Sequence, residues 1–316
     1  MSREKLTTTI PEELAGLRLD QALARMFPEY SRSRLKEWLL DGAIRVEGGP
    51  TRPKDAVSGG ERVDLEPRAE AEVEALPEPM DLDIVHEDDA VLVVNKPAGL
   101  VVHPGAGNPS GTLMNGLLHH SARLEEVPRA GIIHRIDKDT SGLLLIARTL
   151  PAHTALVRQL AEREIAREYL AICCGVLTGG GTIDEPIARH PVDRTRMSVQ
   201  QGGRHAVTHF TVVKRFRAHS YIRVRLETGR THQIRVHFAW RRNPLVGDPV
   251  YGGRLALPAG ASDALVEALR GFRRQALHAT RLAFTHPSTG AGIELEVPPP
   301  GDFASLIEVL REDASQ

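Results

Sequence analysis

The sequence predicts an α+β protein in which a small α/β domain precedes a larger domain built on a mixed, mostly antiparallel sheet. Two helix-like segments and two short alternating segments fall within residues 17–65. Further along the chain, residues 206–213 and 221–226 alternate polar and apolar side chains, as half-buried antiparallel strands do. A chain of 316 residues is long enough for one small and one large domain.

The first helix is predicted from apolar residues at Leu19, Leu23 and Phe27, which are spaced like one helix face. A second helix is predicted over residues 31–40, ended by Asp41-Gly42. Two short segments that alternate like strands complete this domain, at residues 43–46 and 62–65. We therefore expect a first domain over residues 16–66.

Residues 67–80 are predicted to form an acidic linker before a second domain at 81–316. This stretch alternates alanine and glutamate and then carries Pro77 and Pro79, a composition that disfavours packing. Residues 68–90 have a net charge of −8, whereas residues 91–316 have +8. The overall charge of −1 therefore conceals a basic large domain that suits a polyanionic partner.

In the large domain, apolar runs and turn residues indicate the remaining elements. Strands are expected at 90–94, 100–102, 131–133, 143–147 and 169–176. Helices are expected at 111–120, 151–164 and 303–310, and residues 234–238 fit a short helix or a strand. These elements together predict one α+β unit from residue 82 onward.

Several classes of protein are disfavoured by the composition. No stretch approaches the ~18 uninterrupted apolar residues of a membrane span, and residues 1–10 lack the apolar core of a signal peptide. Cys173 and Cys174 are adjacent, which indicates reduced thiols and a cytoplasmic protein. His232 and His237 do not have metal-ligand spacing, and the glycine-rich residues 105–111 match no nucleotide-binding loop. We expect neither a metal nor a cofactor.

The most informative segment is His134 to Gly142, a polar stretch between two apolar runs. Such a pattern is typical of a loop held by two buried strands, which gives its side chains a fixed position. Asp137 lies in this loop between Arg135 and Lys138, and these cations favour an ionised carboxylate. An ionised and positioned aspartate can act as a nucleophile, although a bare motif of this kind is more often a surface ion pair.

This segment resembles the His-Arg-Leu-Asp-x-x-Thr-Ser-Gly motif of the RluA family of RNA pseudouridine synthases, with Ile136 in place of leucine. Two further segments resemble motifs of the same family, Thr228 to His237 and Asn95 to Gly105. The N-terminal domain resembles the S4 RNA-binding domain. The resemblance extends from about Leu17 to Leu310 and implies a pseudouridine synthase fold for the large domain.

By this resemblance, three residues carry the reaction. Asp137 is implied to be the nucleophile, and Tyr169 is implied to pack on the flipped uracil. Arg235 is implied to pair with the catalytic carboxylate, with Arg230 as the competing candidate. The alternatives from the residues alone are a core tyrosine at position 169 and a surface ion pair at 137. Whether the aspartate attacks C1′ or assists formation of a glycal-type intermediate stays open.

The same resemblance implies the residues that contact RNA. Arg135 is expected to fill the gap that the extruded nucleotide leaves, or otherwise to contact a phosphate. His134 and Arg230 are expected beside it, with His134 shaping the loop. The S4 resemblance adds three cations of the second predicted helix, which composition alone would assign to a solvated surface: Arg32, Arg34 and Lys36.

Residues 28–34, 102–108 and 246–253 are similar to the RluD branch of the family, which acts on large-subunit (23S) ribosomal RNA. We therefore expect a monomeric isomerase whose partner is this RNA or a pre-50S particle. The sister RluC-like branch, acting on other sites of the same RNA, is an alternative. So are a non-catalytic S4-type ribosome-assembly factor and a glycosidase that pairs Asp137 with Asp139.

Overall fold

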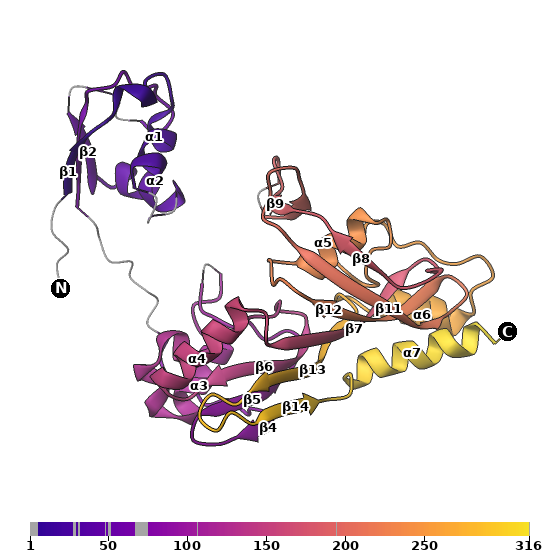
Figure 1. Ribbon diagram of the computed structural model, residues 1–316. Coiled ribbons are helices and arrows are strands. Elements are labelled where there is room, and N and C mark those ends of the chain that lie inside the picture. The colour runs from indigo at the N-terminus through magenta and orange to yellow at the C-terminus, as the bar shows by residue number, and fades with distance from the viewer. Residues whose placement is uncertain are drawn as a thin grey trace. The chain divides into compact units, whose positions relative to one another are not determined.

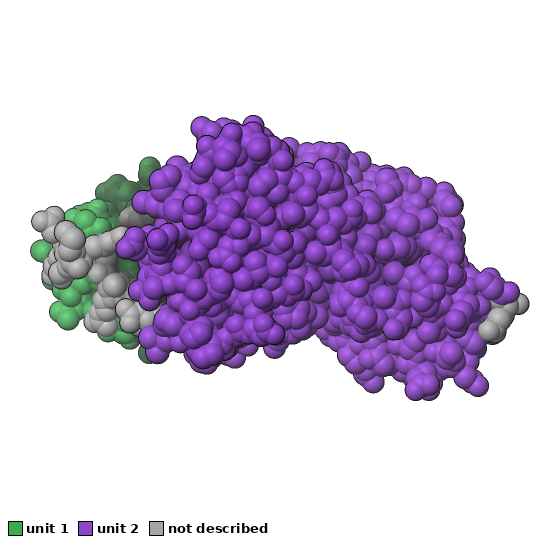
Figure 2. Space-filling view, turned by 90° about the horizontal axis from the view of Figure 1, so that it is seen from below, with its two compact units in different colours: residues 1–74 green, residues 75–316 purple. Residues whose placement is uncertain are grey.

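The computed structural model describes residues 6–27, 30, 32–47, 49, 52–66, 75–105, 107–193 and 195–315, without the side chains of Ser33 and Arg34. The chain divides into two compact units, residues 1–74 and 75–316, which Figure 2 colours separately. The division falls within the stretch predicted to be a linker, of which residues 67–74 lie outside the described part. Each unit is described by itself below.

The small unit packs two helices against a three-stranded antiparallel sheet in the order β1-β3-β2. Its elements are β1 (Leu6–Thr9), α1 (Leu19–Met26), α2 (Arg32–Leu40), β2 (Ile44–Glu47) and β3 (Arg62–Leu65). The apolar stripe of α1 is buried against Leu35 and Trp38 of α2, as its spacing predicted. Only β1 was not predicted, since its sequence Leu-Thr-Thr-Thr does not alternate.

Nine of the described strands of the large unit form one sheet (Figure 1). The strands are β4 (Ile84–Glu87), β5 (Val91–Lys96), β6 (Ser141–Ala147), β7 (Ala166–Cys174), β8 (Gly181–Asp184), β11 (Val207–Arg215), β12 (His219–Leu226), β13 (Leu277–Thr285) and β14 (Gly292–Glu296). Their order is β4-β5-β6-β13-β7-β12-β11-β8, and β14 pairs with β13. Only β6 and β13 pair in parallel, so the predicted mixed and mostly antiparallel sheet is confirmed.

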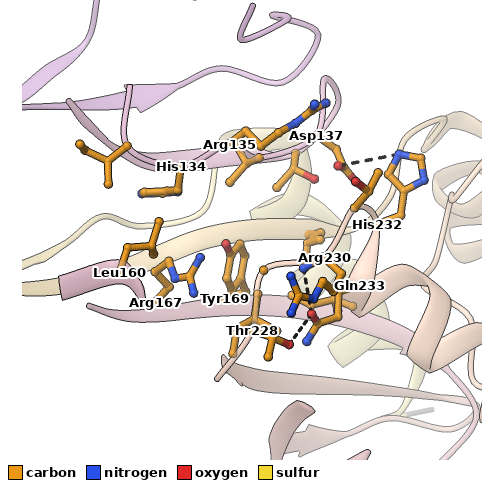
Figure 3. Close-up of a pocket in the computed structure, with 18 of the residues that line it drawn as sticks. His134, Arg135, Asp137, Leu160, Arg167, Tyr169, Thr228, Arg230, His232 and Gln233 are labelled. Carbon is orange, nitrogen blue, oxygen red and sulfur yellow. Dashed lines mark hydrogen bonds and ion pairs between the residues drawn. The ribbon is translucent and has the colours of Figure 1, made fainter. Parts of the chain in front are cut away.

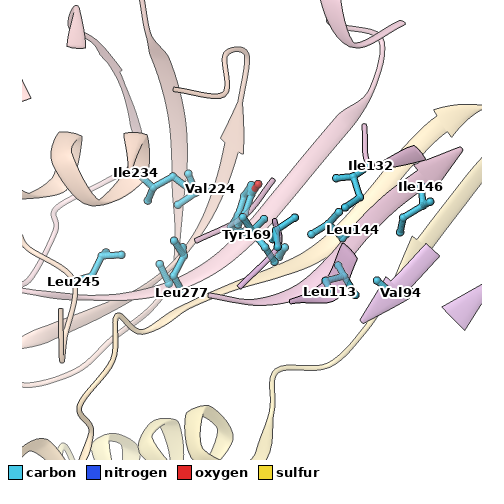
Figure 4. Close-up of a cluster of buried hydrophobic side chains, with 14 of the residues drawn as sticks. Val94, Leu113, Ile132, Leu144, Ile146, Tyr169, Val224, Ile234, Leu245 and Leu277 are labelled. Atoms are coloured by element: carbon cyan, nitrogen blue, oxygen red, sulfur yellow. The ribbon is translucent and has the colours of Figure 1, made fainter. Parts of the chain in front are cut away.

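Successive residues of β7 enter different cores, because side chains alternate between the two faces of a strand. Tyr169 and Ala171 join one cluster, with α3 (Leu113–His120) and α5 (Gln233–Trp240). Figure 4 shows Tyr169 within this cluster. Leu170 joins a cluster on α6 (Asp263–Gly271) and α7 (Gly301–Asp313), and α4 (Leu150–Ala161) packs on a third cluster beside β6.

Two predicted strands are wrong. Residues 100–102 form no strand, because the carbonyl groups of Val101 and Val102 accept hydrogen bonds from the first backbone N–H groups of α3. Residues 131–133 form a single bridge, between Ile132 and Ile146, after a 3₁₀ turn at Pro128–Gly131. The ambiguous residues 234–238 belong to the helix α5.

The remaining elements are a 3₁₀ turn at Glu12–Leu14, another at Ala122–Glu126, and a hairpin of β9 (Ile187–Arg189) and β10 (Met197–Val199). In the part of the chain that the structure describes, no helix is long and apolar enough to cross a membrane. Residues 75–80 of the predicted linker contact the large unit. The Nδ2 atom of Asn115 donates to the carbonyl group of Leu76, and the carbonyl group of Asn115 accepts a hydrogen bond from the backbone N–H of Glu78.

Candidate active site

A pocket with a cavity volume of about 490 Å³ opens in the large unit beside the segment that precedes β6 (Figure 3). One wall is formed by residues 132–137 and another by residues 226–235. Tyr169 and Arg167 of β7 form its floor, and α4 contributes Leu160 and Ala161. Segments that are distant in the sequence therefore bring the three quoted family motifs and Tyr169 to one place.

Asp137 occupies a tight turn, in which its carbonyl oxygen accepts a hydrogen bond from the backbone N–H of Thr140. The carboxylate is 17% exposed, so it is accessible from the pocket but largely removed from solvent. Its Oδ2 atom accepts a hydrogen bond from Arg235 Nη1 at 2.9 Å. The Nε2 atom of His232 lies 3.9 Å from its Oδ1 atom. The carboxylate thus has one strong cationic partner and one free edge.

Arg235 is buried between two carboxylates. In addition to Asp137, it donates from Nε and Nη2 to the two oxygens of Asp248, at 2.7 and 2.9 Å. Burial acts to lower the pKa of Arg235, but the carboxylates of Asp248 and Asp137 raise it above its ordinary value. Asp248 is itself fixed, since its Oδ1 accepts hydrogen bonds from the backbone N–H groups of Val250 and Tyr251.

The beginning of α5 is anchored by Gln233. Its Oε1 atom accepts hydrogen bonds from Thr228 Oγ1 and from the backbone N–H of Arg230. Its Nε2 atom donates to the carbonyl group of Val207 and to Thr208 Oγ1, both at 3.0 Å. The turn before α5 is therefore attached to β11, and this attachment fixes the direction in which Arg235 leaves the helix.

Tyr169 is 5% exposed and lines the pocket between Asp137 and Arg167 (Figure 3). Burial raises the pKa of its phenol, so the hydroxyl is protonated at neutral pH. A neutral aromatic ring at this place offers a surface on which a nucleobase can stack.

Lys96 is among the largest fully buried side chains of the described residues, and no role was predicted for it. Its Nζ atom donates to the carbonyl groups of Pro97, Leu100 and Lys138, at 2.8 to 2.9 Å. Burial lowers the pKa of this ammonium to about 7. Lys96 therefore attaches the segment after β5 to the turn that carries Asp137.

The other predicted residues occupy different environments. Arg135 is exposed and lines the pocket, whereas His134 is buried and accepts a hydrogen bond at Nε2 from the backbone of Leu145. Arg230 also lines the pocket, but its Nε atom donates to the carbonyl group of His205. Of the two arginines considered as partners of Asp137, Arg235 is the one that bonds it.

In the small unit, Arg32 donates from Nη2 to the buried carboxylate of Asp20 at 2.7 Å, yet 45% of its side chain is exposed. Lys36 is exposed on α2. The side chain of Arg34 lies outside the described residues. A phosphate could reach Arg32 and Lys36 from solvent, although part of the charge of Arg32 is compensated by Asp20.

The two-carboxylate alternative lacks its second group at the pocket, because Asp139 does not line it. The carbonyl oxygen of Asp139 instead accepts a hydrogen bond from Arg274. Among the described residues, no group of three or more histidine, cysteine, aspartate or glutamate side chains could hold a metal ion. The carboxylates that line the pocket are those of Asp137 and Glu227. Glu227 is paired with Arg163 and His209, which leaves the carboxylate of Asp137, one phenol and several cations for chemistry.

Sequence reasoning did not assign roles to four residues of this region: Lys96, Arg167, His232 and Asp248. Lys96 and His232 lie within the quoted motifs, but they contact groups far away in the sequence, at Lys138 and Asp137. Arg167 lies two residues before Tyr169, outside those motifs. Asp248 lies in a segment rich in turn residues, Gly247 to Gly253. The feature of the sequence that could have indicated a role for it is a single acidic residue in a glycine-rich turn.

Comparison with known proteins gives one family model for each unit. A model of the RNA pseudouridylate synthase family matches residues 90–240, and a model of the S4 domain matches residues 17–63. The chain is 55% identical to Ribosomal large subunit pseudouridine synthase D of Escherichia coli strain K12, over 98% of this chain and 96% of that one. It is 54% identical to the protein of the same name from Xanthomonas campestris pv. campestris, over 97% and 93%.

Two solved structures are similar to the large unit. Human RNA Pseudouridylate Synthase Domain Containing 4 aligns with a TM-score of 0.57 and 24% identity, over 72% of this chain and 92% of that one, and supports the fold alone. Human RNA Pseudouridylate Synthase Domain Containing 1 aligns with a TM-score of 0.53 and 26% identity, over 75% and 87%. With full-length relatives at 54–55% identity, the chain belongs to the RluA-type RNA pseudouridine synthases that carry an S4 domain.

Proposed function

We propose that this enzyme isomerises specific uridines of large-subunit (23S) ribosomal RNA to pseudouridine, with Asp137 as the nucleophile acting on a flipped-out nucleotide. The single observation that supports this most strongly is the carboxylate of Asp137 in a pocket, bonded to Arg235 at 2.9 Å. The hydrogen bond from Arg235 fixes one oxygen of a carboxylate that is largely removed from solvent, and the second oxygen is available to the substrate.

The reaction breaks the bond between uracil N1 and ribose C1′ and forms a bond between C5 and C1′. N1 gains a proton and C5 loses one, so the sum of atoms and electrons is unchanged and no co-reactant is needed. Asp137 would assist the departure of the base, either by attack on C1′ or through a glycal-type intermediate. Tyr169 would hold the uracil ring while it turns, and lies where it could help to remove the C5 proton.

Base extrusion would depend on Arg135, which is exposed beside the pocket. Opening a stacked nucleotide costs a few kcal/mol, and a planar cation in the vacated position offsets part of this cost. Arg230 and His134 would contact the extruded strand. In Arg135→Ala, we expect slower turnover with a smaller effect on initial docking; equal losses in the two steps would indicate a phosphate contact instead.

Ribosomal RNA as substrate is supported by the names of the relatives and by the positive charge of residues 91–316. We further propose residues 16–66 as an S4-like RNA-binding domain, with Arg32, Arg34 and Lys36 as phosphate contacts, 67–80 as a linker, and 81–316 as the catalytic domain. We also propose that the protein is a cytoplasmic monomer that acts on the RNA or on a pre-50S particle.

The direct test is to map pseudouridines in large-subunit ribosomal RNA from cells that lack this gene. Re-expression of the intact chain should restore the missing sites, and Asp137→Ala should not restore them while still binding the RNA. Sites restored equally by Asp137→Ala would refute the assignment of the nucleophile. No missing site in large-subunit RNA would refute the substrate.

A further inference from the structure

Arg167 is a buried cation that has no hydrogen-bond or ion-pair partner in the part of the chain that the structure describes. Three lysine or arginine side chains are buried among the described residues, and two of them are satisfied. Lys96 donates to three carbonyl groups, and Arg235 pairs with two carboxylates. The side chain of Arg167 is neither ion-paired nor hydrogen-bonded to any described residue, and its Nε atom is fully buried.

An unpaired buried charge is costly, so it is normally retained only where something compensates it. The only carboxylate beside Asp137 that lines the pocket is Glu227, within the described part of the chain. Glu227 is already engaged, by Arg163 Nη1 at 2.9 Å and by His209 Nε2 at 2.6 Å. Neither carboxylate of the described pocket lining is therefore paired with Arg167, whose guanidinium lines the pocket and can accept an anionic ligand.

His134 adds a second unsatisfied donor to the same pocket. Its Nε2 atom accepts a hydrogen bond from the backbone N–H of Leu145, which assigns the ring proton of a neutral imidazole to Nδ1. Burial lowers the pKa of His134 to about 3, so the ring is neutral. Its Nδ1 atom is buried and has no partner. Two N–H donors, one of them on a cation, thus lack an acceptor.

The position of this pair relative to Tyr169 indicates what the acceptor is. Arg167 and Tyr169 are two residues apart on β7, so their side chains leave the same face, roughly 6.6 Å apart along the strand. Figure 3 shows His134 and Arg167 at the end of the pocket away from His232, with Tyr169 between the two ends. A nucleotide whose base lies against Tyr169 carries an anionic phosphodiester on each side of its ribose, so a negative charge would lie near this end of the pocket.

We propose that Arg167 and His134 form a subsite for a phosphodiester group adjacent to the target uridine. The phosphate oxygens accept from Arg167 and from His134 Nδ1, so the buried charge is neutralised only when RNA is bound. The exposed Arg129 and Arg135 at the same pocket add positive potential that attracts the backbone. This inference rests on the proposed function, because it takes the uridine to lie against Tyr169.

The test combines an enzyme variant with a substrate in which one phosphate is neutral. Arg167→Gln removes the charge, and Arg158→Gln is the matched control on an exposed side chain of α4 outside the pocket. The substrate is an RNA fragment that contains a mapped site, with [5-³H]uridine at the target and a methylphosphonate at the linkage on its 5′ or 3′ side. Tritium release gives kcat/KM, and filter binding of the same RNAs gives the affinity.

Arg167→Gln should lower affinity and kcat/KM for the natural RNA by about 10- to 100-fold, the effect of one charged hydrogen bond. One of the two methylphosphonates should lower the affinity and kcat/KM of the wild type to the same degree. The same methylphosphonate should lower neither the affinity nor kcat/KM of Arg167→Gln any further. Arg158→Gln should behave as the wild type. The subsite would be overturned if the losses from Arg167→Gln and from the neutral linkage multiplied when the two were combined. It would also be overturned if neither neutral linkage affected the wild type.

Stability distinguishes a ligand site from a structural role. Since Arg167 has no partner in the free protein, Arg167→Gln should leave Tm unchanged or raise it, whereas a structural arginine would lower it. Gly229→Ala is a second variant that keeps the charge, because its methyl carbon would lie 2.9 Å from Arg167 Nη1 and displace the guanidinium. As in Arg167→Gln, the neutral linkage should not lower the affinity or kcat/KM of Gly229→Ala any further. The binding measurements need no turnover, so they test the subsite even if Asp137 proved dispensable.

Discussion

Replacement of Asp248 by asparagine would test whether the Asp137–Arg235–Asp248 arrangement is the structural support of the pocket. The side chain of Asp248 is 0% exposed and bonds Arg235 through both oxygens, at 2.7 and 2.9 Å. Asparagine keeps the shape and one carbonyl acceptor but removes the charge. Breaking a buried pair typically costs about 3–5 kcal/mol. Because Arg235 retains Asp137 as a partner, we expect the lower end, about 3 kcal/mol of unfolding free energy.

A matched control is available elsewhere in the large unit. Asp302 bonds Arg274 through both oxygens, at 2.7 and 2.8 Å, but is 51% exposed. A surface pair contributes roughly 0–1 kcal/mol, so Asp302→Asn should cost less than about 1 kcal/mol. The two substitutions make the same chemical change to two pairs of similar geometry, and burial is the main difference between them.

The assay is urea unfolding followed by tryptophan fluorescence. The chain has two tryptophans, Trp38 in the small unit and Trp240 at the end of α5. In a Trp38→Phe background, the signal reports on the large unit alone, which avoids mixing two unfolding transitions. Equal losses for Asp248→Asn and Asp302→Asn, or a loss below about 1 kcal/mol for Asp248→Asn, would refute the reasoning.

The same substitution should also change the pH dependence and the reaction. Burial acts to raise the pKa of Asp248, but Arg235 lowers it below the ordinary value on balance. A depressed folded pKa stabilises the protein above the unfolded pKa of ~4, and this contribution is lost as the pH falls. The difference between wild type and Asp248→Asn should therefore shrink below pH ~4. A loosened Arg235 should misalign Asp137 and lower kcat by about 100-fold.

Three further outcomes are expected. Lys96→Met leaves three carbonyl groups without their donor, so the free energy of unfolding in urea should fall by about 3 kcal/mol or more. A fall of less than about 1 kcal/mol would contradict this role. Burial acts to raise the pKa of Asp88, but hydrogen bonds from backbone N–H groups lower it to about 2. The free energy of unfolding should therefore fall between pH ~4 and pH ~2. In unfolding measured across pH, Asp88→Asn should reduce this fall. Gly142 has a φ of +115°, and a Cβ atom there would lie 2.2 Å from the carbonyl oxygen of Ala279. Gly142→Ala should therefore lower Tm sharply, and an unchanged Tm would refute this steric argument.

The sequence predicted most elements because local periodicity decides them. Residues 206–213 and 221–226 alternate as half-buried strands must, and α1 carries one apolar stripe. The apolar run at 100–102 was misassigned because a strand and a loop that caps a helix can share the same composition. Its role depends on the placement of α3, which no local pattern encodes.

The candidate site was predictable to the extent that family motifs name its residues. Asp137, Tyr169 and Arg235 were expected together, and the pocket contains all three. The partner of Arg235 was not predicted, because Asp248 meets it through the packing of a turn 13 residues away. Lys96 escaped notice because lysine is almost always exposed, and its burial follows only from three carbonyl groups that converge in the fold.

The most direct measurement is tritium release by Asp137→Asn from [5-³H]uridine in an RNA fragment that contains a mapped site, with RNA binding measured in parallel. Asparagine is nearly isosteric but cannot supply the negative oxygen that would act on the ribose. The account predicts that release falls by at least about 10⁴-fold while the affinity for RNA stays within a few-fold of the wild type. Release within tenfold of the wild-type rate would contradict the central claim that this carboxylate carries the reaction.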